Sequence, residues 1–452
     1  MGSTERHYES LAAELAAVEA RYIARHPKSA ERHAFAQRHL PGGNTRSVLH
    51  YRPFPLTWAA GRGNRLTDLD GFEYLDLLGE FSAGLYGHSN SAVRDAMVHA
   101  IDEGVVLGGP NQYEARLAEA IRSRFPSIEL MRFTNSGTEA NLFAMSASRA
   151  ITGRSRVMTF AGAYHGGVFE FGAPAPNLNV PFDWLVGTYN DVAATEKALR
   201  EHAQTLAAVI VEPMLGRGCI PGNHEFLRML RSETSHYGVI LIFDEVMTSR
   251  LSPSGLQGVV GVRPDLTTLG KYFGGGASFG ALGGRRDLME RFDPNREDAF
   301  AHAGTFNNNV ISMAGGLAGL TEAFTPQECA RLNALGDALR NRLNEVSKRR
   351  QANLQATGAG SLIGLHFTPV GVPRHPGPTP SHDDRFARTL AAIQSLFHLD
   401  LLDRGFYFAR RGYIALSLPT TEADCERFAS AVDEFLARRG ALIAAAMMRA
   451  GE

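Results

Sequence analysis

Short apolar runs recur along the middle of the chain, between about residues 90 and 325, with helical segments between them. The clearest runs cover residues 157–160, 207–212 and 239–244. An uninterrupted apolar run of this length is typical of a strand buried on both faces, and strands that alternate with helices are typical of a parallel α/β sheet. The pattern therefore predicts an α/β fold with a large domain built on a mainly parallel sheet.

The two ends of the chain show a different pattern. Residues 8–40 have the apolar spacing of helices, and residues 56–78 read as short strands. Beyond them, the sequence predicts a helix at 310–323, helices at 327–350, 382–403 and 421–447, a loop with five prolines at 369–380, and a strand at 413–418. We predict an N-terminal segment (1–75), a large domain (76–326) and a smaller α+β domain (327–452) that the N-terminal segment completes.

Composition narrows the class of protein. The length of 452 residues fits two or three domains, and 44% hydrophobic with 21% charged residues is typical of a soluble globular protein. A formal net charge of −1 gives no general attraction to nucleic acid or to an anionic membrane. Three cysteines without a CxxC pair argue against a disulfide scaffold and favour a protein of the reducing cytoplasm. We also expect no metal site, no signal peptide and no membrane span.

Polar residues follow directly after several predicted strands. Ser136 comes just after a short strand at 132–134, and Glu212 and Asp244 close two of the apolar runs. In open α/β sheets, the active site lies at the carboxyl ends of the strands. We therefore expect these side chains to converge at one edge of the sheet.

Lys271 ends the stretch 265–271, in which it follows another predicted strand and a glycine. A lysine and a strand-end acid suit pyridoxal phosphate. Lys271 would hold the cofactor aldehyde as a Schiff base, and Asp244 would keep the pyridine nitrogen protonated, which makes the ring an electron sink. The alternatives are a solvated lysine and an acid that caps the next segment.

The stretch Ser136-Gly137-Thr138 stands between a strand and a helix. Backbone N–H groups and hydroxyls at a helix N-terminus form an anion cradle, although a simple helix cap is the alternative. Two other phosphate motifs fail. The residue after Lys271 is Tyr272, not Ser or Thr as in a P-loop, and the glycines at 274–284 do not form GxGxxG between a strand and a helix.

Three more residues have two interpretations each. Tyr164 follows a strand and would stack on a planar cofactor, or belongs to the core. Glu212 faces the active site or makes a structural ion pair, because a buried carboxylate needs a partner. Thr305, in a polar loop, donates to a phosphate at a subunit boundary or belongs to an ordinary capped loop.

Together these motifs resemble those of the class III aminotransferases, the fold type I pyridoxal phosphate enzymes that include glutamate-1-semialdehyde aminomutase. The matching stretches are 135–140, 164–166, 212–213, 244–246, 269–271 and 304–305, in order and in register. The resemblance implies a seven-stranded type of sheet, a smaller α+β domain and a homodimer with shared active sites.

The resemblance also implies a role for each residue. Lys271 binds the cofactor and later moves the proton, while Asp244 pairs with the pyridine nitrogen. The residues implied to contact the rest of the cofactor are Tyr164 and Val246 on the ring faces, Ser136, Gly137 and Thr138 at the phosphate, Glu212 nearby, and Thr305 from the partner subunit.

Within this class, the chain is similar to β-amino-acid transaminases that act on β-phenylalanine. Stretches 41–48, 247–251, 306–309 and 411–413 carry this similarity. It implies a β-amino acid as donor and a 2-oxo acid such as 2-oxoglutarate or pyruvate as acceptor. An arginine at the Arg46 position binds a substrate carboxylate, and a mobile arginine at the Arg411 position binds the α-carboxylate in the other half-reaction. Arginine suits both tasks because its planar fork grips a carboxylate through two N–H bonds.

Three residues depart from the pattern of that family, and we predict that all three line the substrate site. Trp58 is bulkier than the expected aliphatic residue and would shrink a pocket. Phe81 stands where tyrosine is common. Arg217 is unexpected, and it adds a carboxylate contact or points to solvent. The alternative functions are an ω-amine transaminase, an aminomutase that needs no external acceptor and, remotely, a non-catalytic binding protein.

Overall fold

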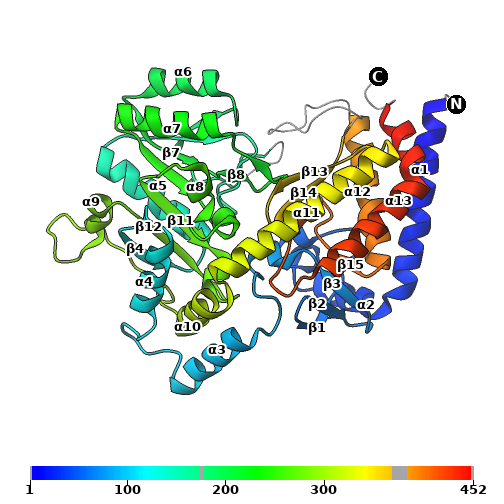
Figure 1. The fold of residues 1–452 in the computed structure, drawn as a ribbon, viewed down its shortest axis with the longest axis horizontal. Coiled ribbons are helices and arrows are strands. Elements are labelled where there is room, and N and C mark those ends of the chain that lie inside the picture. The colour runs from blue at the N-terminus through cyan, green and yellow to red at the C-terminus, as the bar shows by residue number, and fades with distance from the viewer. Residues whose placement is uncertain (1–2, 173–177, 369–383, 449–452) are drawn as a thin grey trace.

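The computed structural model describes residues 3–172, 178–368 and 384–448, which form two lobes (Figure 1). The lobe at the left of Figure 1 holds the large sheet, and the lobe at the right holds α1 (Ser3–Arg25) and α13 (Glu422–Met448). The long helix α11 (Pro326–Arg350) leads from the first lobe to the second. The predicted domain boundaries after residues 75 and 326 stay a prediction.

A seven-stranded sheet forms the centre of the first lobe. In spatial order its strands are β4 (Leu130–Thr134), β12 (Gly280–Gly284), β11 (Leu266–Gly270), β10 (Ile240–Asp244), β7 (Leu206–Val211), β5 (Arg156–Phe160) and β6 (Asp183–Gly187). β12 runs antiparallel to both of its neighbours, and the other pairs are parallel. The predicted α/β class with a mainly parallel sheet is confirmed.

The apolar strands separate two cores. Along β10, Ile240 and Ile242 belong to the core that includes α5 (Gly137–Thr152), whereas Leu241 and Phe243 belong to the core that includes α7 (His224–Tyr237). Because alternate side chains point to opposite faces of a strand, burial on both faces requires an unbroken apolar run. This is why the sequence pattern identified these strands.

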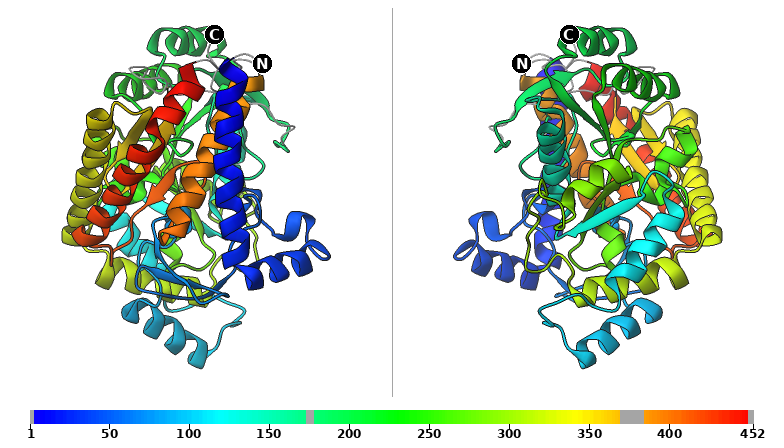
Figure 2. Two further views of the ribbon diagram at one scale, coloured as in Figure 1. Left: turned by 90° about the vertical axis from the view of Figure 1, so that its right-hand side faces the viewer. Right: turned by 90° about the vertical axis from the view of Figure 1, so that its left-hand side faces the viewer.

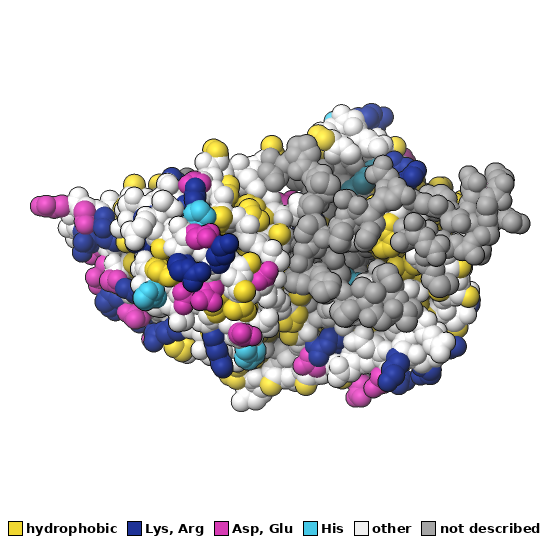
Figure 3. All heavy atoms as spheres, turned by 90° about the horizontal axis from the view of Figure 1, so that it is seen from above, with side chains coloured by type: hydrophobic (Ala, Val, Ile, Leu, Met, Phe, Trp, Pro, Cys, Tyr) yellow, Lys and Arg dark blue, Asp and Glu magenta, His cyan; other side chains and the backbone are white. Residues whose placement is uncertain are grey.

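Helices begin where the sequence offers a cap. The side chains of Ser136, Asp191 and Asn223 accept the N–H of a residue in the first turn of α5, α6 (Val192–His202) and α7, respectively. This lobe also contains the helices α3 (Ser91–Glu103), α4 (Glu114–Arg124), α8 (Gly255–Val260), α9 (Arg286–Met289) and α10 (Val310–Ala318). Seen from above, over α6 and α7, acidic and basic side chains intermingle (Figure 3), as the near-zero net charge predicts.

The second lobe joins segments from both ends of the chain. Strands β1 (Trp58–Arg62), β2 (Arg65–Asp68) and β3 (Glu73–Asp76) form a sheet with β15 (Phe406–Tyr407), while β13 (Leu354–Ala359), β14 (Leu362–Phe367) and β16 (Tyr413–Ala415) form another. Helix α1 packs against α12 (Asp384–Asp403) and α13, as Figure 2 shows, and α2 (Pro27–Gln37) follows α1. Segments from the N-terminal and C-terminal parts of the chain therefore lie together in this lobe.

Some elements differ from the prediction. Strands β6, β12, β13, β14 and β15 were not predicted, and β16 is shorter than the predicted strand at 413–418. β12 is rich in glycine, which normally argues against a strand. Here the glycine permits close approach, because a Cβ on Gly280 would lie 2.1 Å from the carbonyl oxygen of Ser136. The predicted proline loop at 369–380 lies outside the described residues.

Candidate active site

Lys271 lies at the carboxyl end of β11, in the short turn Lys271–Gly274. Its φ of 60° is left-handed, an uncommon conformation for a residue other than glycine. Burial, the largest cause, lowers the pKa of Lys271 to about 8. The charge of Asp244 opposes this shift, while Arg46 and Arg411 add to it. The side chain is therefore an amine that loses its proton far more readily than an ordinary lysine.

Asp244 ends β10, the strand beside β11, with Thr268 as its neighbour across the ladder. Its carboxyl group is buried, and it accepts three hydrogen bonds. Oδ2 accepts from the Asn141 side-chain amide at 2.8 Å and from Nδ1 of His165 at 2.8 Å, and Oδ1 accepts from the N–H of Val246 at 3.0 Å. Three donors around a buried carboxyl group are the arrangement that a carboxylate anion needs.

Asn141 and His165 were not predicted as supports of the site. Asn141 lies on α5 and accepts from the hydroxyl of Thr268 at 2.6 Å, and Nε2 of His165 lies 3.1 Å from the hydroxyl of Thr159. Both side chains are buried. The available signal for Asn141 was an amide among the apolar Ala140, Ala144 and Met145 of α5, because a buried amide needs a polar partner.

The predicted phosphate cradle stands at the N-terminus of α5. Oγ of Ser136 accepts the N–H of Glu139 at 3.2 Å, so Ser136 does cap the helix. A Cβ on Gly137 would lie 2.7 Å from Val246, and a Cβ on Gly166 would lie 2.3 Å from the hydroxyl oxygen of Thr138. These close approaches bring the cradle against the segments that follow β5 and β10.

Glu212 and Tyr164 join the same edge of the sheet. The buried carboxyl of Glu212 accepts the N–H of Tyr164 at 3.0 Å and the N–H of Gly216 at 2.9 Å. Burial, the largest cause, raises the pKa of Glu212 to about 7, and Asp244 raises it further, while His165 and the two N–H donors lower it. The Tyr164 side chain is 49% exposed, so its ring is not a core group and has an open face.

Arg46 and Arg411 come together on one aromatic ring. The Cζ atom of Arg46 lies 5.6 Å from the centre of the Phe81 ring, and that of Arg411 lies 5.2 Å from it. Arg46 also pairs with Glu80. Arg411 has a second ring contact, at 5.8 Å from the centre of Tyr413. A guanidinium over an aromatic face is held by a weak attraction, so Arg411 stays available for a carboxylate, whereas Arg46 would have to exchange Glu80 for one.

The backbone under Phe81 is strained. Gly79, Glu80, Phe81 and Ser82 have φ values of 52°, 48°, 52° and 76°, a left-handed turn that costs roughly 1–2 kcal/mol for each residue with a side chain. The carboxyl of Asp76 holds the start of the turn by accepting the N–H of Leu78 at 2.9 Å and the N–H of Gly79 at 3.0 Å. Strain of this kind collects at functional sites.

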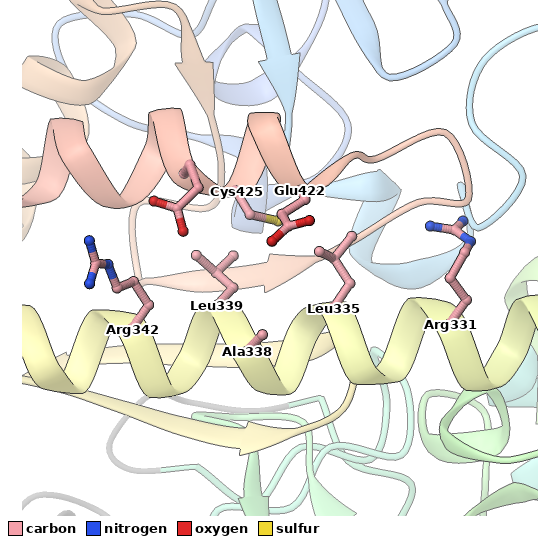
Figure 4. A pocket seen from close by; sticks show the side chains of 8 residues that line it. Arg331, Leu335, Ala338, Leu339, Arg342, Glu422 and Cys425 are labelled. Atoms are coloured by element: carbon pink, nitrogen blue, oxygen red, sulfur yellow. The ribbon is translucent and has the colours of Figure 1, made fainter.

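The remaining residues that the sequence singled out, Trp58, Arg217 and Thr305, differ in their surroundings. Trp58 is packed edge-on against Tyr407 and Tyr74, with ring centres 4.6 and 5.4 Å away. Arg217 pairs with Glu170. Thr305 is exposed on a loop of the first lobe. A separate groove lies between α11 and α13 (Figure 4), and none of the residues singled out from the sequence lines it.

The residues at the sheet edge fit pyridoxal phosphate. Lys271 offers an amine with a lowered pKa, Asp244 offers a buried carboxylate on the next strand, and Tyr164 offers an open aromatic face. The N-terminus of α5 offers N–H groups and hydroxyls for a phosphate. Fold and site together are those of a pyridoxal phosphate-dependent enzyme.

Comparisons with known proteins agree. The family model "Aminotransferase class-III" matches residues 48–375. Beta-phenylalanine transaminase of Variovorax paradoxus is 47% identical, over 94% of this chain and 96% of that protein, and a glutamate-1-semialdehyde 2,1-aminomutase of Methanocella arvoryzae is 33% identical, over 90% and 98%. A crystal structure of a Variovorax paradoxus beta-phenylalanine aminotransferase covers 95% of this chain and 98% of its own, with a TM-score of 0.91 and 46% identity.

The chain belongs to the class III aminotransferases. It is a pyridoxal phosphate-dependent aminotransferase, as the sequence motifs predicted. Within the described parts of the chain, no helix is both long and apolar enough to cross a bilayer.

The pKa of Lys271 has a measurable consequence in the cofactor-free protein. The neutral, reactive amine forms as the pH rises through about 8. We expect the rate at which an amine-reactive reagent labels Lys271 to rise with pH up to that region and then level off. The rate for a model lysine peptide should keep rising to about pH 10. Peptide mapping by mass spectrometry would measure both rates. A Lys271 rate that follows the model peptide would contradict the lowered pKa.

Proposed function

We propose that this aminotransferase takes the amino group of a β-amino acid of the β-phenylalanine type and transfers it to a 2-oxo acid such as 2-oxoglutarate or pyruvate. The observation that carries the proposal is the pair of guanidinium groups, Arg46 and Arg411, on the Phe81 ring beside Lys271. Two separate cations suit two successive substrates, each with a carboxylate at a different distance from the reacting carbon. The similarity to beta-phenylalanine transaminase supports the choice of donor.

Each residue would act on a stated group. When bound, pyridoxal phosphate supplies a carbonyl carbon that accepts the amino group and a ring that withdraws electrons. Lys271 would anchor it and carry the proton from the substrate carbon, a task that suits an amine with a pKa of about 8. Asp244 would keep the pyridine nitrogen protonated. Tyr164 and Val246 would enclose the ring, and Ser136, Gly137 and Thr138 would hold the phosphate.

A panel of amino donors tests the proposal. Both enantiomers of β-phenylalanine, aliphatic β-amino acids and simple amines would be assayed against pyruvate and 2-oxoglutarate. We expect β-phenylalanine to have the highest kcat/KM. Equal turnover of simple amines would indicate an ω-amine transaminase. Turnover of glutamate-1-semialdehyde without any 2-oxo acid would indicate an aminomutase. Inactivity of the pyridoxal phosphate-loaded protein on every donor would indicate a binding protein.

The role of Arg46 predicts a selective loss. Replacing Arg46 by Ala removes charge-assisted hydrogen bonds to the donor carboxylate, each contributing about 1.5–3 kcal/mol. We expect kcat/KM for β-phenylalanine to fall by about 10- to 100-fold. Activity with 1-phenylethylamine, which lacks the carboxylate, should change by less than about threefold. Equal losses for both donors would argue against a carboxylate contact.

We also propose a homodimer in the cytoplasm, in which Thr305 reaches the phosphate site of the partner. Apolar side chains on α3 and on the loops after α3 and around Thr305 support this: Val98, Ile101, Val105, Val106, Leu107 and Phe306 are all more than a third exposed. Apolar groups gathered in this way favour association. Light scattering should give about twice the chain mass of 49.1 kDa. A monomeric active enzyme would contradict the proposal.

A further inference from the structure

Arg217 occupies the tip of a small hairpin at the rim of the site. The hairpin joins β8 (Met214–Leu215) to β9 (Ile220–Pro221). On one side of Arg217, the N–H of Gly216 binds Glu212, the carboxylate that also accepts the N–H of Tyr164. On the other side, the carbonyl of Gly218 accepts from the hydroxyl of Thr357 at 2.6 Å. The backbone of Arg217 is therefore fixed from both sides, close to the proposed ring-stacking residue.

The side chain of Arg217 is held far less firmly than its backbone. Its guanidinium pairs with Glu170, which forms a β-bridge with Tyr164. The two side chains are 37% and 40% exposed. A Cβ on Gly172 would lie 2.5 Å from Cζ of Arg217, so a larger residue there would make the guanidinium shift from its present place. An ion pair this open to solvent is weakly stabilising, and the guanidinium can exchange one carboxylate for another.

Arg217 and Arg411 lie on neighbouring segments, because a Cβ on Gly364 would lie 2.4 Å from the carbonyl oxygen of Gly218, and Gly364 pairs with Tyr413 in the ladder between β14 and β16. Loss of solvent is the largest cause that lowers the pKa of Arg411, and the positive charge of Arg217 lowers it further. Within the described residues, the Arg411 guanidinium contacts the rings of Phe81 and Tyr413 and pairs with no acid. Two adjacent guanidinium groups, one paired weakly and one stacked on rings, complement a ligand with two carboxylates.

We propose that Arg217 determines which 2-oxo acid the enzyme accepts: it leaves Glu170 and binds the distal carboxylate of a dicarboxylic 2-oxo acid of the 2-oxoglutarate type, while Arg411 binds the α-carboxylate. This inference rests on the proposed function, because it assigns the acceptor of the second half-reaction. The exchange replaces one Arg–carboxylate pair by another, so breaking the pair with Glu170 costs the ligand little binding free energy. Pyruvate has no second carboxylate and gains nothing from Arg217.

Two variants with opposite expected effects test the assignment. Arg217→Met removes the cation and keeps the length of the side chain. Glu170→Gln removes the competing charge, while the backbone of Glu170 stays anchored to Asn179 at 2.7 and 2.9 Å. The control is Arg342→Met, an exposed arginine of the groove in Figure 4 that pairs with Glu345 at 3.9 Å. All three would be assayed as holoenzymes, with one donor and either 2-oxoglutarate or pyruvate.

For Arg217→Met, kcat/KM with 2-oxoglutarate is expected to fall by about 10- to 100-fold, with the value for pyruvate within about threefold of the wild type. Glu170→Gln should raise kcat/KM for 2-oxoglutarate and leave pyruvate unchanged, and Arg342→Met should match the wild type. Equal losses on both acceptors, or no loss on 2-oxoglutarate, would overturn the inference.

Glutarate and butyrate supply a second readout that needs no turnover. Glutarate has two carboxylates and no oxo group, so it binds without reacting, and butyrate has one carboxylate. Calorimetry on the holoenzyme is expected to show a weaker glutarate affinity for Arg217→Met, a stronger one for Glu170→Gln, and little change for butyrate. Glutarate affinity that does not depend on Arg217 would overturn the inference. If β-amino acids prove inactive while glutarate binding follows Arg217, the proposed donor fails and the dicarboxylate site stands.

Discussion

Replacing Lys271 by Ala is expected to reduce turnover by at least about 10⁴-fold, because one side chain both anchors the cofactor and moves the proton. No neighbour can take over. The other lysines of the chain, Lys28, Lys197 and Lys348, are exposed on α2, α6 and α11, and the carboxyl of Glu212 is already engaged by two backbone N–H groups. Single-turnover kinetics with β-phenylalanine would measure the loss.

The matched control for this prediction is Lys348→Ala, which removes an exposed lysine from α11. It should keep wild-type kinetics. Borohydride reduction followed by peptide mapping should place the cofactor on the peptide that contains Lys271 in the wild type and in Lys348→Ala, and on no peptide in Lys271→Ala. Substantial residual turnover of Lys271→Ala, at enzyme well below substrate concentration, would remove Lys271 from the mechanism.

Local sequence was sufficient for most strands of the large sheet. The runs that became β5, β7 and β10 are buried on both faces, so their positions are apolar apart from Arg156 and Thr159 in β5 and the terminal Asp244 in β10. β12 could not be found this way. Its glycines are needed because Asp265 and Ser136 carbonyls pass close by, with a Cβ on Gly284 lying 2.1 Å from the oxygen of Asp265. That requirement comes from neighbours distant in sequence.

The residues of the candidate active site also fall into two groups, those that local sequence indicates and those that it does not. The positions of Lys271 and Asp244 were predictable because Asp244 ends a recognisable strand, Lys271 follows another, and parallel strands bring their carboxyl ends together. Asn141 and His165 were not predicted as partners of Asp244, since their roles depend on where α5 and the turn after β5 meet β10. Arg46 and Arg411 were predicted from the resemblance alone, and nothing local indicates that both would lie over Phe81.

Asp244→Asn is expected to lower kcat by about 10²- to 10⁴-fold while the protein stays folded, since the amide fills the same space but carries no charge to hold the pyridine nitrogen protonated. Its neighbour Glu245 is the matched control. Glu245 is also buried, but its carboxyl accepts the N–H groups of Leu256 and Gln257, at 3.0 and 2.7 Å, and so holds the start of α8.

We therefore expect opposite outcomes for the two adjacent acids: a loss of kcat for Asp244→Asn and a loss of stability for Glu245→Gln. Glu245→Gln weakens buried charge-assisted bonds and should lower stability by about 1–3 kcal/mol, with kcat within about threefold of the wild type. Asp244→Asn keeps the side-chain shape beside Asn141 and should affect kcat far more than the melting temperature. Thermal unfolding and steady-state kinetics on both variants separate the two roles. If Asp244→Asn lost stability and kept its kcat, the acid would be a structural partner of Asn141 and His165, and another group would have to hold the proton on the ring.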